Sequence, residues 1–207
     1  MEAVLDVYAR PYDPLRPVVC LDEKRKQLVR ETRPGFTDSH GLRHDDYEYE
    51  RNSVGVLYMV CEPLGGRREV LVEAGQDRLA WARTVQHLAE TMYPAAERIT
   101  LVQDNLRAHK PSALYEILAP ERARAVLERL EIVHTPKHGS WLNIAEIELS
   151  VLGRQALAGR IGDEVELERV VASWSTARTS AQKGVDWQFT TADARVKLKR
   201  LYPSYIS

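Results

Sequence analysis

The amino-acid sequence predicts an α/β protein with a mixed sheet, an antiparallel meander followed by parallel strands, flanked by helices. Three β-rich segments come first and are close enough in sequence to pair as antiparallel neighbours. Two later apolar segments alternate with amphipathic stretches, which is the pattern of parallel strands joined by helical crossovers. The chain has 207 residues, of which 44% are hydrophobic and 29% charged. This length and composition predict one folded domain.

The expected strands are short apolar runs that end at polar or turn-forming residues. The first is Pro17–Asp22, and Lys26–Glu31 is expected to fold back on it as a hairpin. Residues 33–52 are polar, contain two glycines and the acidic DYEYE stretch, and predict a long loop. The remaining expected strands are Ser53–Cys61, Glu69–Glu73, Arg98–Asp104 and Glu131–Thr135.

The expected helices show apolar residues at helical spacing. In Asp77–Met92, for example, Val85, Leu88 and Met92 can share one face, and Pro94 ends the segment. The set comprises Asp77–Met92, Ser112–Leu130 with an interruption near Pro120, Asn143–Ala158, Asp163–Arg178 and Ala192–Leu201.

Charge divides the chain into regions. Residues 1–16 are rich in proline at their end and predict an extended lead-in, followed by a domain over residues 17–180 and a basic tail over residues 181–207. Residues 37–150 hold 13 basic and 18 acidic side chains, whereas residues 151–207 hold nine basic and six. The overall net charge of −1 argues against a nucleic-acid partner only if charge is spread evenly. An acidic centre that binds cations beside basic surfaces that face phosphates is compatible with nucleic acid.

Localisation follows from what the sequence lacks. It has no apolar run of 18 residues and no signal-peptide pattern, so we expect no membrane partner. Cys20 and Cys61 lie inside apolar runs and predict buried thiols in a reducing cytoplasm rather than a disulfide or zinc site.

Two aspartates are the first candidates for chemistry. Asp22 and Asp104 each end an expected strand, and ligands of such sheets bind beyond the carboxyl ends of the strands. A single aspartate after a strand is more often a turn or cap residue. Two at equivalent strand ends favour a shared site.

A third acid lies in the first turn of an expected helix. Asn143 and Glu146 have the spacing of a capping box, which is the structural alternative to a functional role for Glu146. If Glu146 lies beside the two aspartates, the three carboxylates would bind Mg²⁺, and a pair of such ions can assist in-line phosphoryl displacement. Glu148 competes with Glu146, and helical spacing places the two about 200° apart without deciding between them.

Three segments around these acids, VVCLDEKRKQL, LVQDNLRAHK and TPKHGSWLNIAEIELSVLGRQ, resemble the DDE transposases of bacterial insertion sequences. The resemblance is to the mariner-like group, the insertion-sequence six-thirty type, and extends from about Val4 to Tyr202. The family usually has proline at the position of Ile144. The spacing of 42 positions from Asp104 to Glu146 exceeds the commonest mariner-like spacing.

The resemblance implies a ribonuclease-H-like fold with a DDE catalytic domain over residues 17–180. It implies that Asp22, Asp104 and Glu146 are the catalytic residues and hold two Mg²⁺ ions, with Mn²⁺ as a substitute. The implied reactions are hydrolysis of DNA at transposon ends and transfer of the released 3′ hydroxyl to target DNA. The implied partners are these DNA segments, a second copy in a synaptic homodimer, and a separate helix-turn-helix chain, since only 21 residues precede Asp22. The location would be the cytoplasm, associated with the nucleoid.

Further residues have both a functional and a structural interpretation. Glu23 follows Asp22 and should point to the opposite face of its strand, as a supporting acid. The other candidates for supporting roles are Asn105, His109, Asn143 and Glu148. The candidates for DNA contact are Lys137, His138, Lys197 and Arg200, and a solvated surface is their structural alternative.

Two other functions remain open at this point. A truncated transposase without catalysis would bind DNA or assemble with a complete enzyme as a regulator. A ribonuclease-H-like nuclease of other role would cut RNA–DNA hybrids without strand transfer.

Overall fold

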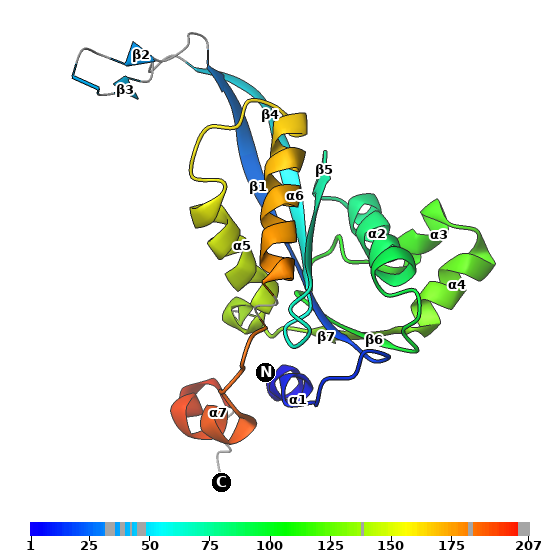
Figure 1. The fold of residues 1–207 in the computed structure, drawn as a ribbon. Helices are drawn as coiled ribbons and strands as arrows, with labels where there is room; N and C mark the ends of the chain where they lie inside the picture. Colours follow the sequence, from blue (N-terminus) through cyan, green and yellow to red (C-terminus); the bar gives the residue numbers. More distant parts are fainter. Residues whose placement is uncertain are drawn as a thin grey trace.

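The computed structural model describes residues 1–31, 36–37, 40–41, 43–44, 49–137, 139–181 and 184–202. The main sheet has five strands in the order β5-β4-β1-β6-β7 (Figure 1). These are β1 (Val18–Glu31), β4 (Tyr49–Cys61), β5 (Arg68–Glu73), β6 (Ile99–Gln103) and β7 (Leu130–His134). β4 pairs antiparallel with β1 and β5, whereas β6 pairs parallel with β1 and β7. The predicted mixed sheet is therefore confirmed.

The longest strand, β1, continues well past the body of the sheet. It pairs with β4 from Cys20 opposite Cys61 to Glu31 opposite Tyr49, with one irregularity between Leu28 and Val29. The predicted hairpin within residues 17–31 is wrong, because β4 supplies hydrogen-bond partners along the whole of β1. The predicted loop over residues 33–52 is also too long, since β4 begins at Tyr49. Two short strands, β2 (Phe36–Thr37) and β3 (Arg43–His44), pair with each other.

Helices cover both faces of the sheet (Figure 1). Helices α5 and α6 lie on one side, and α2, α3 and α4 lie on the other. The α-helices are α1 (Glu2–Tyr8), α2 (Arg78–His87), α3 (Leu114–Ile117), α4 (Pro120–Glu128), α5 (Ile144–Gln155), α6 (Glu164–Ser180) and α7 (Thr191–Lys197). Short turns of other helix types are η1 (Leu88–Met92), η2 (Pro111–Ala113), η3 (Ser140–Leu142) and η4 (Lys199–Leu201). Among the described residues no helix combines the length and apolarity needed to span a membrane.

Alternate residues of the strands face two separate cores. Val19 and Leu21 of β1 pack with Trp81 in the core beneath α2. Cys20 faces the other core, beneath α5, and its partner across the sheet is Cys61. Both cysteines are buried free thiols, as predicted. The parity of β1 therefore places even-numbered residues on the α5 side and odd-numbered residues on the α2 side.

The first residues of the chain belong to the core, so the predicted extended lead-in is wrong for residues 2–8. These residues form α1, in which Val4 and Leu5 are buried against the α5 side of the sheet. The hydroxyl of Tyr8 donates a hydrogen bond to the carbonyl of Leu142 at 2.7 Å. Only the later, proline-containing part of the lead-in lacks regular structure.

The tail also packs against the body. The Tyr8 and Trp187 rings lie 5.0 Å apart between centroids, and Arg195 of α7 forms an ion pair with Glu2 of α1 at 2.8 Å. The predicted helix over residues 192–201 is not continuous. α7 ends at Lys197 and is followed by the short turn η4, so Lys197 and Arg200 do not share one helical ridge.

Candidate active site

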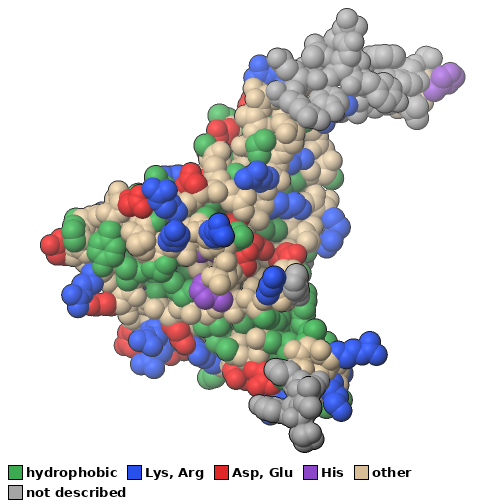
Figure 2. All heavy atoms as spheres, turned by 180° about the vertical axis from the view of Figure 1, so that it is seen from behind, with side chains coloured by type: hydrophobic (Ala, Val, Ile, Leu, Met, Phe, Trp, Pro, Cys, Tyr) green, Lys and Arg blue, Asp and Glu red, His purple; other side chains and the backbone are tan. Residues whose placement is uncertain are grey.

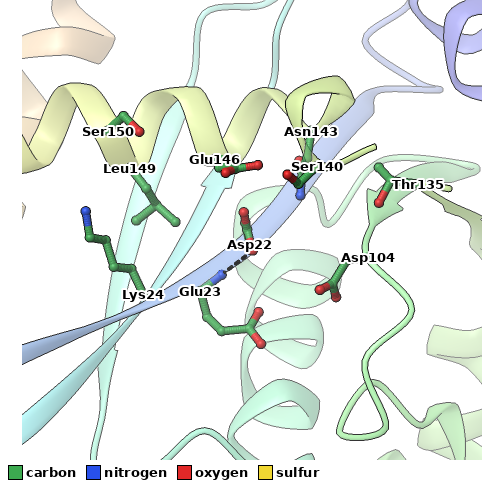
Figure 3. Close-up of a pocket in the computed structure, with 10 residues that line it drawn as sticks. All are labelled: Asp22, Glu23, Lys24, Asp104, Thr135, Ser140, Asn143, Glu146, Leu149 and Ser150. Carbon is green, nitrogen blue, oxygen red and sulfur yellow. Dashed lines mark hydrogen bonds between the residues drawn. The ribbon is translucent and has the colours of Figure 1, made fainter. Parts of the chain in front are cut away.

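A pocket of about 340 Å³ lies between β1, the end of β6 and the start of α5 (Figure 3). It brings together the three predicted carboxylates Asp22, Asp104 and Glu146, which come from segments far apart in the sequence. The residues that line it are Asp22, Glu23, Lys24, Asp104, Thr135, Ser140, Asn143, Glu146, Leu149 and Ser150.

Strand register explains why the two aspartates meet. The parallel pairing of β1 with β6 ends at Cys20 opposite Val102, and each aspartate lies two residues beyond that pair. Asp104 directly follows the end of β6, as predicted. Asp22 does not end a strand, because β1 continues and pairs Asp22 with Met59 of β4. The prediction of two equivalent strand ends is thus right for Asp104 and wrong for Asp22.

Asn143 joins α5 to β1 next to Asp22. Its side-chain oxygen accepts a hydrogen bond from the Ala145 amide at 3.2 Å, which confirms it as the N-cap. Its side-chain nitrogen donates to the carbonyl of Leu21 at 2.9 Å. One buried amide therefore fixes the start of the helix that carries Glu146 against the residue that precedes Asp22.

The reciprocal half of the predicted capping box is missing. The amide of Asn143 donates to the carbonyl of Ser140 at 2.7 Å, so it does not need the Glu146 carboxylate. Oε2 of Glu146 is buried and has no hydrogen-bond partner. A buried carboxylate oxygen without a partner is costly, and a cation is the partner that would satisfy it.

The pocket is unfavourable for negative charge in the absence of cations. Burial, together with the nearby carboxylates of Glu23, Asp104 and Glu146, raises the pKa of Asp22 to about 7. The amide of Glu23 donates to Asp22 Oδ1 at 2.9 Å and opposes this rise. A bound divalent cation stabilises the charged form of a carboxylate, such as Asp22, whose pKa is raised by burial and by neighbouring acids.

The three carboxylates are the right kind of ligand for a hard divalent cation, but they are too far apart in this structure to bind one ion together. The candidate ligands are all carboxylates, which are the ligands that Mg²⁺ and Mn²⁺ prefer. Among the described residues, however, no three acidic, histidine or cysteine side chains are grouped closely enough to hold one ion. All three carboxylates could bind the same ion only if they came closer together than they are in this structure.

His109 lies behind the pocket and contacts two acids. Its Nδ1 is 3.1 Å from Asp104 Oδ1, and its Nε2 is 3.3 Å from Glu23 Oε2. Burial lowers the pKa of His109, but the carboxylates of Asp104 and Glu23 outweigh it and raise the pKa to about 9. The ring stacks on Trp81 with centroids 5.9 Å apart. His109 is therefore a buried ring whose contacts tie Asp104 to Glu23.

Glu23 points to the α2 side of β1, as predicted from strand alternation. Gln76, which precedes α2, donates to Glu23 Oε1 at 2.9 Å. The Glu23 side chain is 1% exposed and borders the pocket from the α2 side of β1. Its contacts with Gln76 and His109 agree with the predicted supporting position.

Glu148 lies outside the pocket, on the other side of α5. Its carboxylate is 2.8 Å from Nε of Arg68 and accepts hydrogen bonds from Arg178 Nε at 3.0 Å and Nη2 at 2.9 Å. Burial raises the pKa of Glu148, but the two guanidinium groups outweigh it and lower the pKa. Of the two acids that helical spacing left open, only Glu146 lines the pocket, so its position favours Glu146 as the third candidate ligand.

The remaining predicted residues are not brought into the pocket. Asn105 and Lys137 are exposed on loops beside it, without contributing to its lining. Lys197 forms an ion pair with Asp193 at 3.3 Å, and Arg200 is exposed in η4. His138 lies outside the described residues. DNA contact by these residues stays a prediction.

Several lining residues were missed by the sequence analysis. Lys24 could have been found, because it is two residues beyond Asp22 on the same face of β1. Ser150 could also have been found, because it is one helical turn after Glu146. No sequence signal marks the lining residue Thr135, or Gln76, which contacts Glu23 outside the lining, because the positions of both depend on how distant segments pack.

Comparison with known proteins agrees with this geometry. Residues 17–168 match the family described as DDE superfamily endonuclease. No curated protein sequence matches the chain. Three solved structures of the Mos1 transposase are similar to it. The Mos1 mariner paired end complex with Mn has 17% identity and a TM-score of 0.55. The matched region covers 87% of this chain and 54% of the Mos1 chain.

The two other Mos1 structures give similar values. The strand transfer complex has 17% identity, a TM-score of 0.56 and the same coverage. The paired-end complex with left transposon end has 18% identity, a TM-score of 0.54, and covers 85% of this chain and 52% of its own. The chain thus spans about half the length of the transposases that it matches. At these identities the likeness concerns the fold, which is the predicted ribonuclease-H-like mixed sheet. Because the family match spans most of the sequence, the chain belongs to the DDE superfamily endonuclease family.

Proposed function

We propose that this chain is the catalytic domain of a mariner-like transposase of the bacterial insertion-sequence six-thirty type. It would cut DNA at transposon ends and join the released 3′ ends to target DNA. The observation that carries the proposal is the meeting of Asp22, Asp104 and Glu146 in one pocket, with a buried oxygen of Glu146 left without a partner.

The three carboxylates would hold two Mg²⁺ ions, with Mn²⁺ as a substitute. Such ions lower the pKa of water and offset the charge that develops on the attacking and leaving oxygens of a phosphodiester. The chain's own residues prepare the site. Asn143 fixes α5 against β1, and His109 holds Asp104 in place through its contact at 3.1 Å.

The proposed partners are the transposon ends, target DNA and a second copy of the chain in a homodimer. A helix-turn-helix chain would supply recognition of the transposon ends. Support for the DNA partners comes from the solved neighbours, which are DNA complexes of Mos1. The proposed location is the cytoplasm, associated with the nucleoid.

The test is metal-dependent cleavage of a duplex that carries the element's terminal repeat. Asp104→Asn should reduce cleavage to the background level, because it removes one charged ligand from the pocket. Glu97→Gln is the matched control, since Glu97 is an exposed acid in a surface ion pair with Arg16 at 3.3 Å.

Full activity of Asp104→Asn would overturn the assignment of the site. Binding of DNA without cleavage by the wild-type chain would favour a regulator. Cleavage of RNA–DNA hybrids without strand transfer would favour a nuclease of other role.

A further inference from the structure

A second hollow, of about 440 Å³, continues from the carboxylate pocket between β1 and α5. The two share Lys24 and Ser150 in their linings, so they lie side by side along β1 and α5. We call this second hollow the β1–α5 groove. The residues that line it are Lys24, Arg25, Lys26, Leu57, Ser150, Gly153, Arg154 and Leu157.

Two of its four cations are already committed to the fold. Lys26 donates to the carbonyls of Leu157 at 2.8 Å and Gly159 at 3.0 Å, and so holds the end of α5 against β1. Arg25 donates to Gln76 at 3.0 Å, which places its guanidinium on the α2 side.

The two other cations, Lys24 and Arg154, are exposed and form no hydrogen bond or ion pair with the described residues. Lys24 has acids nearby but does not pair with them. In Figure 3 its amine points along α5 toward Ser150, away from Asp22 and Glu146. Many arginines elsewhere are paired, for example Arg78 with Glu116 at 2.8 Å. Lys24 and Arg154 are therefore two cations without a partner among the described residues, along the groove that adjoins the acidic pocket.

Figure 2 shows that Lys and Arg side chains also surround acidic side chains on the face seen from behind. Positive and negative side chains thus alternate on this surface, and the net charge of −1 does not reveal this distribution. A nucleic-acid strand needs cations for its phosphates and, at the reacting phosphate, acids that hold metal ions.

Gly153 keeps the groove open at its middle. It lies inside α5 with no positive φ, so backbone conformation gives no reason for glycine there. A Cβ at this position would lie 3.4 Å from Lys24 Nζ. Glycine in a helix interior costs about 0.5–1 kcal/mol relative to alanine. The missing side chain leaves room beside the amine of Lys24 for a ligand.

We propose that the β1–α5 groove binds backbone phosphates of the DNA strand that enters the carboxylate pocket, through Lys24 and Arg154. This inference rests on the proposed function and says along which surface the DNA substrate reaches the carboxylate pocket. Lys24 lies two residues beyond Asp22 on the same face of β1, about 6.6 Å along the strand. Its amine points away from Asp22, so it would bind a phosphate that flanks the reacting one.

The experiment measures binding of a random-sequence DNA duplex by fluorescence anisotropy over a range of salt concentrations. All proteins carry Asp104→Asn, so that cleavage does not interfere. Lys24→Gln and Arg154→Gln should each weaken binding about ten-fold and reduce the slope of log affinity against log salt by about 0.9. Arg169→Gln is the matched control, because Arg169 is an exposed cation of α6 that lines neither hollow. It should change neither quantity.

A second variant separates loss of binding from loss of folding. Gly153→Gln replaces glycine with a better helix former, so the melting temperature should stay the same or rise. Its side chain should nevertheless fill the groove and weaken DNA binding about ten-fold. Affinity and salt slope equal to those of the control in all three groove variants would overturn the proposal.

The outcome is independent of the proposed catalytic activity. Salt-dependent binding requires neither metal nor strand cleavage, whereas the proposed function is tested by cleavage with Asp104 intact. A chain that binds through the groove without cutting DNA would retain this inference and lose the proposed activity. If the wild-type chain cuts DNA but the groove variants bind DNA as well as the control, the proposed activity stands and this inference is lost.

Discussion

Glu146 and Glu148 lie two residues apart on α5 and point to opposite sides of that helix. Glu146 reaches the pocket with one oxygen unpartnered, whereas Glu148 is held by Arg68 and Arg178 from β5 and α6. The second carboxylate thus anchors the helix that presents the first. Because the two residues share charge and helix, they form a natural pair of variants for separating stability from activity.

Replacing Glu148 should damage stability, and replacing Glu146 should not. Glu148→Gln leaves the buried guanidinium of Arg68 and the half-buried one of Arg178 without their carboxylate, and should lower the free energy of unfolding by about 3–5 kcal/mol. Glu146→Gln removes an unpaired charge and should leave that free energy unchanged or raised, while abolishing cleavage. Urea unfolding of both variants, followed by circular dichroism, checks this. Equal stability losses in the two variants would contradict the assigned positions.

The Glu148 anchor should also make stability depend on pH in the acid range. Its pKa is lower in the folded chain than its ordinary value of 4.5, because of Arg68 and Arg178. The stabilisation is therefore fully present above that ordinary value and is lost as pH falls through the lowered pKa. The stability difference between wild type and Glu148→Gln should shrink from about pH 5 to about pH 3. A difference that stays constant over this range would contradict the prediction.

Divalent cations should stabilise the folded chain through the carboxylate pocket. At about 100 times the dissociation constant, Mg²⁺ or Mn²⁺ should raise the melting temperature by about 5–10 °C. Asp22→Asn should raise the melting temperature without metal, because burial and neighbouring acids disfavour the Asp22 charge. The same variant should lose most of the metal response. Thermal scans with and without cation, at constant ionic strength, measure both effects.

His109 should affect metal affinity although it does not line the pocket. His109→Gln removes the ring that contacts Asp104 and Glu23, so Mn²⁺ affinity should fall about 10–100-fold. Isothermal titration calorimetry gives the value. Asn105→Ala is the matched control, because Asn105 is exposed on the same loop and should have no effect. Unchanged affinity in His109→Gln would show that Asp104 holds its position without the ring.

The first helix should contribute to the stability of the whole domain. Leu5 of α1 is 2% exposed, and Leu5→Ala should lower the free energy of unfolding by about 2–5 kcal/mol. Leu15→Ala, at a residue that is 46% exposed in the irregular segment, should change it by less than about 0.5 kcal/mol. Urea unfolding curves of the two variants distinguish a core helix from a detachable lead-in.

The parts of the fold that the sequence predicted are those with local signals. Short apolar runs marked β5, β6 and β7 to within a residue or two, and Asp77 was correctly placed at the start of α2, where it is the N-cap. The continuity of β1 could not be read, because Lys24, Arg25 and Lys26 are polar and their strand conformation depends on β4. Tertiary pairing there overrides the local pattern.

The candidate site divides in the same way. Asp22, Asp104 and Glu146 were placed by motif and spacing, and the structure brings them into one pocket. The role of Glu148 could not be predicted, because its partners Arg68 and Arg178 are 80 and 30 residues away in sequence. Contacts at such separations leave no periodic trace in a single sequence.

The three pocket carboxylates differ in how their backbones are held. Asp22 lies within a paired strand and Glu146 within a helix, but Asp104 starts a loop whose carbonyl contacts Nδ1 of His109 at 3.1 Å and of His134 at 3.2 Å. Ligand distances are about 2.0–2.1 Å for Mg²⁺ and about 2.3–2.6 Å for Ca²⁺. If the three carboxylates hold an ion, accommodation of ions of different radius would therefore fall to the Asp104 loop, and the two histidines that contact it would limit how far the site can expand.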